Sequence, residues 1–155
     1  MGFQCPECGA ATAEGQTCRD YFDQMLYWEN EDPARGIVHH LMVLCYHLQH
    51  PGLYSAEGLA HGRELLADFV ARGVTPQEAR RNNREHVASG NRAWSITARP
   101  GNVGAYERPI TWTMTAADVV AGGPENYIDK VQAWAEEAYR TLAEGGYYGS
   151  SSGEG

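Results

Sequence analysis

The sequence lacks long hydrophobic runs and is poor in basic residues. No stretch approaches the roughly eighteen uncharged apolar residues of a membrane-spanning helix, and the amino terminus has neither the basic leader nor the apolar core of a signal peptide. We therefore expect a cytoplasmic protein without a membrane partner. The 12 Lys and Arg residues face 20 Asp and Glu, for a net charge of −8 at pH 7. Such a chain lacks the positive field that draws nucleic acid, although the Arg-rich residues 63–108 could hold one small anion.

The common catalytic motifs are also missing. The chain contains no internal repeat, phosphate-binding loop, dinucleotide fingerprint or nucleophile elbow, so no motif of this kind points to a reaction. Its 155 residues fit one domain with one modest core, which we place at residues 1–144. Residues 145–155 are rich in Gly and Ser and cannot bury enough apolar surface to order, so they are predicted to form a flexible tail.

What the chain does contain is a cysteine pair near its beginning. Cys5 and Cys8 are separated by two residues, one of them Pro, and Gly9 follows. A tight turn of this kind lets two thiolates face one ion, as in a zinc knuckle, and glycine lets the backbone fold back. In a reducing compartment, cysteines are metal ligands or free thiols more often than disulfides. The alternatives are a redox pair or two unused thiols, but no βαβ pattern supports a thioredoxin-like site.

Two helices are predicted to position further ligands. Thr17 begins a capping box that starts a helix and leaves Cys18 in its first turn. The stretch 32–51 is nearly uncharged apart from its histidines and predicts a buried central helix, capped by Asp32 and stopped by Pro51. A short link makes the two helices an antiparallel hairpin, so Cys18 should lie level with the far end of the central helix.

This geometry predicts one closed metal site made of three thiolates and one imidazole. Its ligands are Cys5, Cys8, Cys18 and His50. The ion, which we expect to be zinc, would pin the N-terminal knuckle to one end of the hairpin. Cys45 is a competing fourth ligand, although a single helical cysteine is more often a small buried hydrophobe. His39 cannot share the ion with His50, because eleven residues at about 1.5 Å each separate them by roughly 16 Å.

The rest of the chain predicts more helix with one interruption. Ser55 and Thr75 open two helices, and Thr115 and Pro124 open two more. Within residues 91–114, the runs AWSIT and ITWTM are β-rich and frame a long loop, so we predict a short β-hairpin or a loop insertion. The predicted fold class is therefore mainly α, a small helical bundle with an N-terminal zinc knuckle.

Side-chain patterns on two of these helices carry further expectations. In the last helix the apolar stripe faces inward and Trp134 lies at its margin. The helix opened by Ser55 has a polar stripe opposite its apolar face, made of Glu57, His61, Glu64 and Asp68. Carboxylates and histidines bind metals in helical bundles at this spacing, but such a stripe is usually a solvated face, which we favour.

The loop between the two β-rich runs is a candidate pocket lining, because long ordered loops in small domains often carry function. Together with the central helix it would bind a small molecule or a protein partner, with plain packing as the alternative. The candidate pocket residues are His39, Tyr46, Arg99, Tyr106, Arg108 and Trp112.

Several segments together resemble a known family. The stretches CPECG, CRDYF, VHHLMVLCYHLQHP and WTMTAADVVAGG are similar to a bacterial family catalogued only as a domain of unknown function, and the VHxLxVxxYxxQHP pattern is the most specific. The resemblance covers about residues 5–143. It implies that the motif positions are Cys5, Cys8, Cys18, His39, Tyr46, Gln49 and His50. It also implies that Cys45 and His47 vary among relatives, and it supplies no reaction.

Three functions are consistent with these observations. We favour a small zinc-binding helical protein with a structural ion and a pocket for a small ligand or partner. The second is a metal-dependent hydrolase or transferase with an open site that uses His39 or His61 and a metal-bound water. The third is a regulatory interaction module that senses thiol oxidation or metal supply through its N-terminal cysteines.

Overall fold

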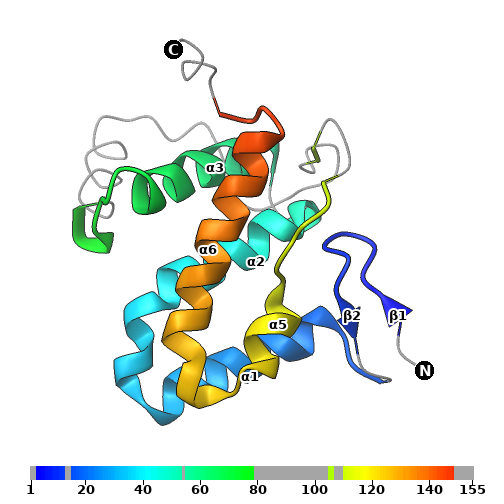
Figure 1. The fold of residues 1–155 in the computed structure, drawn as a ribbon, viewed down its shortest axis with the longest axis vertical. Helices are drawn as coiled ribbons and strands as arrows, with labels where there is room; N and C mark the ends of the chain where they lie inside the picture. Colours follow the sequence, from blue (N-terminus) through cyan, green and yellow to red (C-terminus); the bar gives the residue numbers. More distant parts are fainter. Residues whose placement is uncertain (1–2, 13–14, 54, 79–104, 107–109, 149–155) are drawn as a thin grey trace.

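The fold is mainly α, as the sequence predicts (Figure 1). The computed structural model describes residues 3–12, 15–53, 55–78, 105–106 and 110–148. In this part of the chain the α-helices are α1 (Cys18–Glu31), α2 (His39–Gln49), α3 (Ala56–Val70), α5 (Ala116–Ala121) and α6 (Tyr127–Glu144). The 3-10 helices are η1 (Pro33–Val38), η2 (Pro51–Leu53) and η3 (Pro124–Asn126). Near the amino terminus, β1 (Phe3–Gln4) and β2 (Ala11–Thr12) form a two-stranded antiparallel sheet.

The helix starts follow the predicted capping residues. In α1 the Asp20 N–H donates to the Thr17 hydroxyl at 3.3 Å, and the Thr17 N–H donates to the Asp20 carboxylate at 2.8 Å. The Ser55 hydroxyl accepts from the Gly58 N–H at 2.9 Å and starts α3. A second capping box, at Thr115, starts α5. These side chains satisfy backbone donors that the first turn of a helix leaves unpaired.

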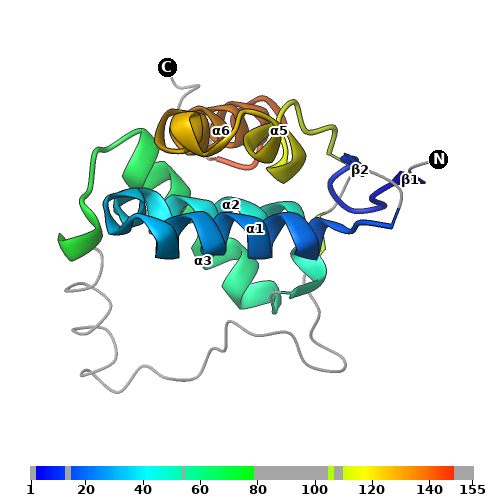
Figure 2. The same cartoon turned by 90° about the horizontal axis from the view of Figure 1, so that it is seen from below.

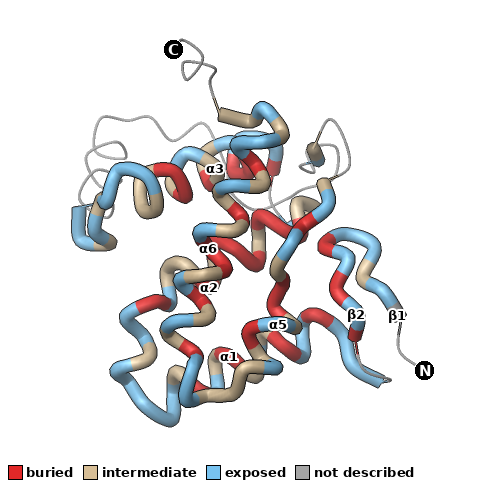
Figure 3. The backbone as a smooth tube through the Cα atoms, in the orientation of Figure 1, coloured by how far each residue is buried: buried red, intermediate tan, exposed pale blue. Residues whose placement is uncertain are grey.

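The helices pack in layers around α2. Helices α5 and α6 lie over α1 and α2 (Figure 2), and α3 contacts both α2 and α6. The buried segments of these helices face the centre of the molecule (Figure 3). Helix α2 is buried over most of its second half, whereas its first residue, His39, is exposed. The predicted central helix is therefore confirmed, and its carboxyl end is the better covered one.

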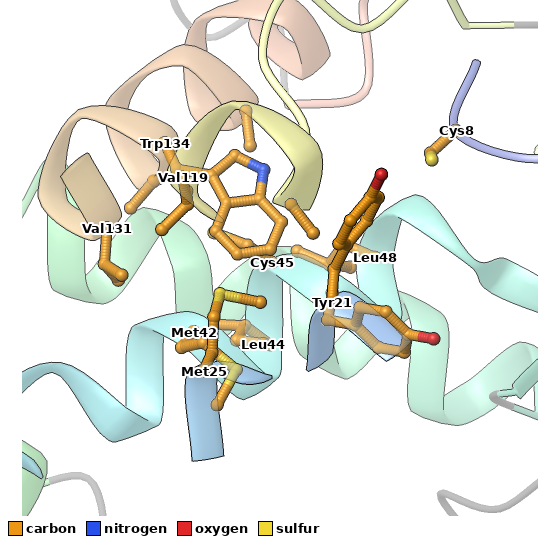
Figure 4. Packing of buried hydrophobic residues seen from close by; sticks show 14 of the residues in the cluster. Cys8, Tyr21, Met25, Met42, Leu44, Cys45, Leu48, Val119, Val131 and Trp134 are labelled. Carbon is orange, nitrogen blue, oxygen red and sulfur yellow. The ribbon is translucent and has the colours of Figure 1, made fainter. Parts of the chain in front are cut away.

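Trp134 of α6 lies in the middle of the core and is fully buried. Figure 4 shows its indole among Val119 of α5 and Cys45 of α2, which belong to the same core cluster. The prediction that Trp134 lies at the margin of its helix is therefore wrong. Because α6 packs against α2, α3 and α5, its buried face is wider than a single neighbouring helix would require.

The entry to the central helix also differs from the prediction. Residues 33–38 form η1, a 3-10 helix, rather than the first turns of an α-helix. Asp32 caps this segment as predicted, because its carboxylate accepts a backbone N–H at 3.1 Å. Gly36 within the segment disfavours α-helix through its backbone entropy, which is consistent with a tighter and shorter element there.

The predicted strand at residues 110–114 is absent. This run is extended chain that leads into α5, and it buries Trp112 against the core. Residue types that favour strands also suit any half-buried surface. A strand additionally needs a hydrogen-bonded neighbouring strand. The other predicted run, residues 93–97, lies outside the described residues. The same is true of most of the charged helix predicted after Thr75.

The carboxyl end of the described chain packs on the bundle. The Tyr148 hydroxyl donates to the Arg63 carbonyl at 2.8 Å, and the Tyr147 ring lies 5.3 Å from that of Tyr106. The remainder of the predicted tail, residues 149–155, lies outside the described part. In the ranges that the structure describes, no helix is both long enough and apolar enough to cross a membrane.

Candidate metal centre

The N-terminal knuckle is a tight turn closed by backbone hydrogen bonds. The Cys5 N–H donates to the Ala10 carbonyl and the Gly9 N–H donates to the Cys5 carbonyl, both at 2.9 Å. Gly9 has a φ of 80°, in the left-handed region that favours glycine. Pairing of Phe3 with Thr12 in the small sheet closes the base of the turn. The CPECG sequence therefore folds locally as its spacing predicts.

The predicted antiparallel hairpin of α1 and α2 is also present. Toward its open end the rings of Phe22 and Tyr46 have centroids 4.6 Å apart. Near its closed end the Glu29 carboxylate lies 2.6 Å from the His39 ring. The same alignment of the two helices brings Cys18, in the first turn of α1, beside His50, the residue that follows α2.

Four ligand atoms converge where the knuckle meets the open end of the hairpin. We call the group the CCCH cluster; its members are Cys5, Cys8, Cys18 and His50. Their ligand atoms all lie within 4.8 Å of one another. The Sγ atoms of Cys8 and Cys18 are 3.5 Å apart, and the Cys5 Sγ is 3.7 Å from the His50 Nε2. Ligand atoms around one tetrahedral zinc lie roughly 3.5–3.8 Å apart, so the spacing fits a single ion.

The imidazole of His50 is oriented before any ion binds. Its Nδ1 donates to the Tyr46 carbonyl at 2.7 Å, one turn earlier in α2. Its ring also packs on the Tyr46 ring, with centroids 4.3 Å apart. Once the ring is neutral, as zinc binding requires, the proton is on Nδ1 and the lone pair of Nε2 is directed at the thiols. Histidine ligands of metals are commonly held in this way by a second hydrogen bond to a carbonyl or carboxylate.

Hydrogen bonds within the CCCH cluster shift its proton affinities. The hydrogen bond from Cys18 lowers the pKa of Cys8 to about 4, although burial acts in the opposite direction. The same hydrogen bond, together with burial, raises the pKa of Cys18. Burial acts to lower the pKa of His50, but hydrogen bonds with Cys8 and the Tyr46 carbonyl together raise it to about 9. Without a metal the cluster therefore combines a thiolate with protonated neighbours.

Cys45, the competing fourth ligand, lies outside the CCCH cluster. It is fully buried on α2 among core residues, and burial raises its pKa. A buried thiol with a raised pKa stays protonated and behaves as a small hydrophobe. The structure therefore supports packing as the role of Cys45.

One residue of the knuckle contributes a contact that the sequence did not suggest. The Glu7 carboxylate accepts a hydrogen bond from the Gly52 N–H in η2 at 3.0 Å. This contact joins the knuckle to the segment just after His50 through two residues that do not belong to the CCCH cluster. Its only sequence signal is the position of Glu7 between the two cysteines.

The candidate pocket residues fall into separate groups. Tyr106 donates from its hydroxyl to the Leu48 carbonyl at 2.5 Å, and its ring lies 6.1 Å from that of Trp112. Tyr46 lies beside the CCCH cluster, and His39 lies at the other end of α2. Arg99 and Arg108 are outside the described residues. The pocket therefore stays a prediction.

The polar stripe of α3 shows no metal-binding geometry. Glu57 and Glu64 are exposed, and His61 and Asp68 are partly exposed. Within the described ranges, the CCCH cluster is the group whose side chains could hold an ion. The solvated-face interpretation of α3 is therefore favoured.

Comparison with known sequences agrees with the expected resemblance. The profile of a Family of unknown function (DUF5946) matches residues 3–143. The chain belongs to this family. The DUF5946 match includes every member of the CCCH cluster, the hairpin of α1 and α2, and nearly all of α6. No curated protein and no solved structure matches the chain.

Proposed function

We propose that this member of DUF5946 is a small zinc-binding protein whose CCCH cluster holds one structural ion. The observation that supports this most is the convergence of four ligand atoms from three separate segments of the chain. Three thiolates and one imidazole are a donor set that suits zinc, because soft sulfur ligands favour it over magnesium or calcium. Four protein ligands complete a tetrahedral site and leave no position for a substrate, as in structural zinc sites.

The ion would add to the few contacts that hold the N-terminal segment, among them the burial of Ala10 in the core cluster. Each strand of the N-terminal sheet has two residues, and a two-stranded sheet alone is marginal in water. Of its further attachments, the Glu7 contact with η2 is at an exposed position. A zinc ion bound by Cys5 and His50 would close a loop that includes all of α1 and α2, and its binding energy would add to the folding energy.

Metal analysis of the purified protein tests this function directly. Protein prepared without added metal should contain one zinc per chain by elemental analysis. X-ray absorption should give three sulfur ligands at about 2.3 Å and one nitrogen at about 2.0 Å. A spectrum with a water ligand in place of a thiolate would favour the open, enzymatic alternative, and protein without stoichiometric metal would contradict the proposal.

Zinc binding should release protons at neutral pH. The pKa of His50 is raised to about 9 and that of Cys18 is raised from its ordinary value, so both groups hold a proton at pH 7 in the metal-free chain. Both must lose it to bind zinc, and we expect release of at least two protons and weaker binding as the pH falls. Calorimetric titration of the protein with zinc, in buffers of different ionisation enthalpy, measures the number of protons released. Release of no proton at pH 7 would contradict this account.

A thiol-based regulatory role is a second candidate, favoured by the 3.5 Å approach of Cys8 and Cys18. Hydrogen peroxide would take two electrons from these thiols, which would join in a disulfide while the peroxide became two waters. We expect zinc release within minutes at millimolar peroxide if this role operates, followed with a colorimetric chelator. Zinc retained under these conditions would restrict the CCCH cluster to structure.

A further inference from the structure

A second polar cluster lies at the end of α2 remote from the CCCH cluster. Glu29 of α1 accepts two hydrogen bonds there, one from α2 and one from α6. The Tyr127 hydroxyl of α6 donates to its Oε2 at 2.5 Å, and the His39 Nδ1 lies 2.6 Å from its Oε1. The Glu29 side chain is only 9% exposed, and Tyr127 is fully buried. The carboxylate is therefore held rigidly by groups on α2 and α6.

This arrangement determines which nitrogen of His39 is available. A carboxylate can only accept, so the Nδ1 of His39 carries the proton that it shares with Glu29. In the neutral ring, Nε2 then has a free lone pair. The His39 side chain is 51% exposed, and no residue in the described part of the chain hydrogen-bonds to its Nε2. The basic atom of the ring is therefore available to a molecule from solvent.

Tyr127 keeps the carboxylate in place behind the imidazole. Burial, and then its hydrogen bond to Glu29, raises the pKa of Tyr127, so the phenol stays protonated and remains a donor. Its ring packs edge-on against Trp28, with centroids 6.0 Å apart. A carboxylate fixed in this way holds one tautomer of histidine and stabilises the imidazolium that forms when Nε2 takes up a proton. These are the features of an enzymatic general base.

We propose that His39 is the general base of a second functional site, oriented by Glu29 and Tyr127 and independent of the metal. Its substrate would be a neutral or cationic small molecule that gives up a proton to Nε2. The charge of this region supports that class, because Glu29, Glu31 and Asp32 outnumber Arg35, which pairs with Glu31 at 3.6 Å, and leave the region net negative. Eleven residues along α2 place His39 roughly 16 Å from His50, beyond contact with the CCCH cluster.

The base can be tested with a neutral carbon acid, 5-nitrobenzisoxazole. His39 Nε2 would take the C–H proton, the C–H electron pair would complete a nitrile, and the N–O bond would break to leave a coloured phenolate. With the zinc-loaded protein, we expect His39→Gln to lower the protein-dependent rate at least fivefold. Glu29→Gln keeps an acceptor for the His39 Nδ1 but removes the negative charge, and it should lower the protein-dependent rate about threefold or more. His61→Gln, which changes a histidine that does not contact Glu29, should change the rate less than twofold.

A further measurement keeps the proposal testable if a variant folds poorly. Nitrogen NMR of the wild-type protein should show the Nδ1–H tautomer for His39. An Nε2–H tautomer would overturn the proposal. So would equal rates for the wild-type protein and His39→Gln, an unchanged rate in Glu29→Gln, or an equal loss in His61→Gln.

Discussion

Replacing Cys18 with serine should abolish stoichiometric zinc binding and detach the N-terminal segment from the helical hairpin. Cys18 is the ligand that belongs both to α1 and to the CCCH cluster, so its loss leaves His50 as the remaining ligand on the hairpin. Free zinc at about 1,000 times its dissociation constant stabilises a protein by about 4 kcal/mol, and Cys18→Ser should lose most of this. Serine is nearly isosteric, so lost packing should contribute little.

The measurement is the melting temperature with and without zinc, paired with metal content. We expect a large zinc-dependent increase in the wild-type protein and almost none in Cys18→Ser. Cys45→Ala is the matched control, because it removes a buried thiol outside the CCCH cluster. It should keep one zinc per chain and lose only the modest stability of a small core deletion. Equal zinc content and equal zinc dependence in Cys18→Ser and the wild-type protein would contradict the proposed site.

Replacing Trp134 with alanine should destabilise the helical bundle by about 3–5 kcal/mol. Its indole is fully buried and contacts a core built from α2, α5 and α6, so its removal leaves a large cavity. The CCCH cluster should still bind zinc in the folded fraction, because Cys8 is set apart from Trp134 at the other side of the core (Figure 4).

Urea denaturation at saturating zinc measures this loss, and Trp134→Phe is the matched comparison. The indole N–H is buried without a hydrogen-bond partner among the described residues. Phenylalanine removes that unpaired donor while keeping an aromatic ring, so its cost should be well below that of alanine. A loss of less than about 1 kcal/mol in Trp134→Ala would show that the core tolerates collapse at this position.

The convergence of the CCCH cluster was predictable because each of its parts depends on local rules. The two-residue spacing of Cys5 and Cys8 forces a turn, and the Thr17 capping box places Cys18 at the start of a helix. The length of the central helix then places His50 level with Cys18 in an antiparallel hairpin. Local spacing and helix geometry were therefore enough to bring four ligands together.

The cluster around Glu29 could not be predicted in the same way. Glu29 and Tyr127 are 98 residues apart, and their contact depends on how α6 packs over α1. No periodicity within either helix reports that packing. The prediction for Trp134 failed for the same reason. Its burial follows from the helices that surround α6 and not from the sequence pattern of α6 itself.

The small sheet and the predicted strand show the limits of composition. Strands β1 and β2 have two residues each, too few for an alternating pattern to be visible. Conversely, the run at residues 110–114 has the residue types of a strand but forms none, because such residues also suit an extended segment packed on a core. In both segments, the presence or absence of a hydrogen-bonded neighbouring strand decided the structure, and the strand propensity of the residues did not.

The two hydrogen bonds that close the knuckle turn offer a way to measure how fast the proposed ion is released. The amides of Cys5 and Gly9 are bonded within a segment too small to persist by itself. Deuterium can therefore enter these two positions only when the segment opens, and with the proposed ion in place the segment would open when zinc departs. Isotope uptake at these amides and capture of zinc by a chelator would then proceed at one common rate.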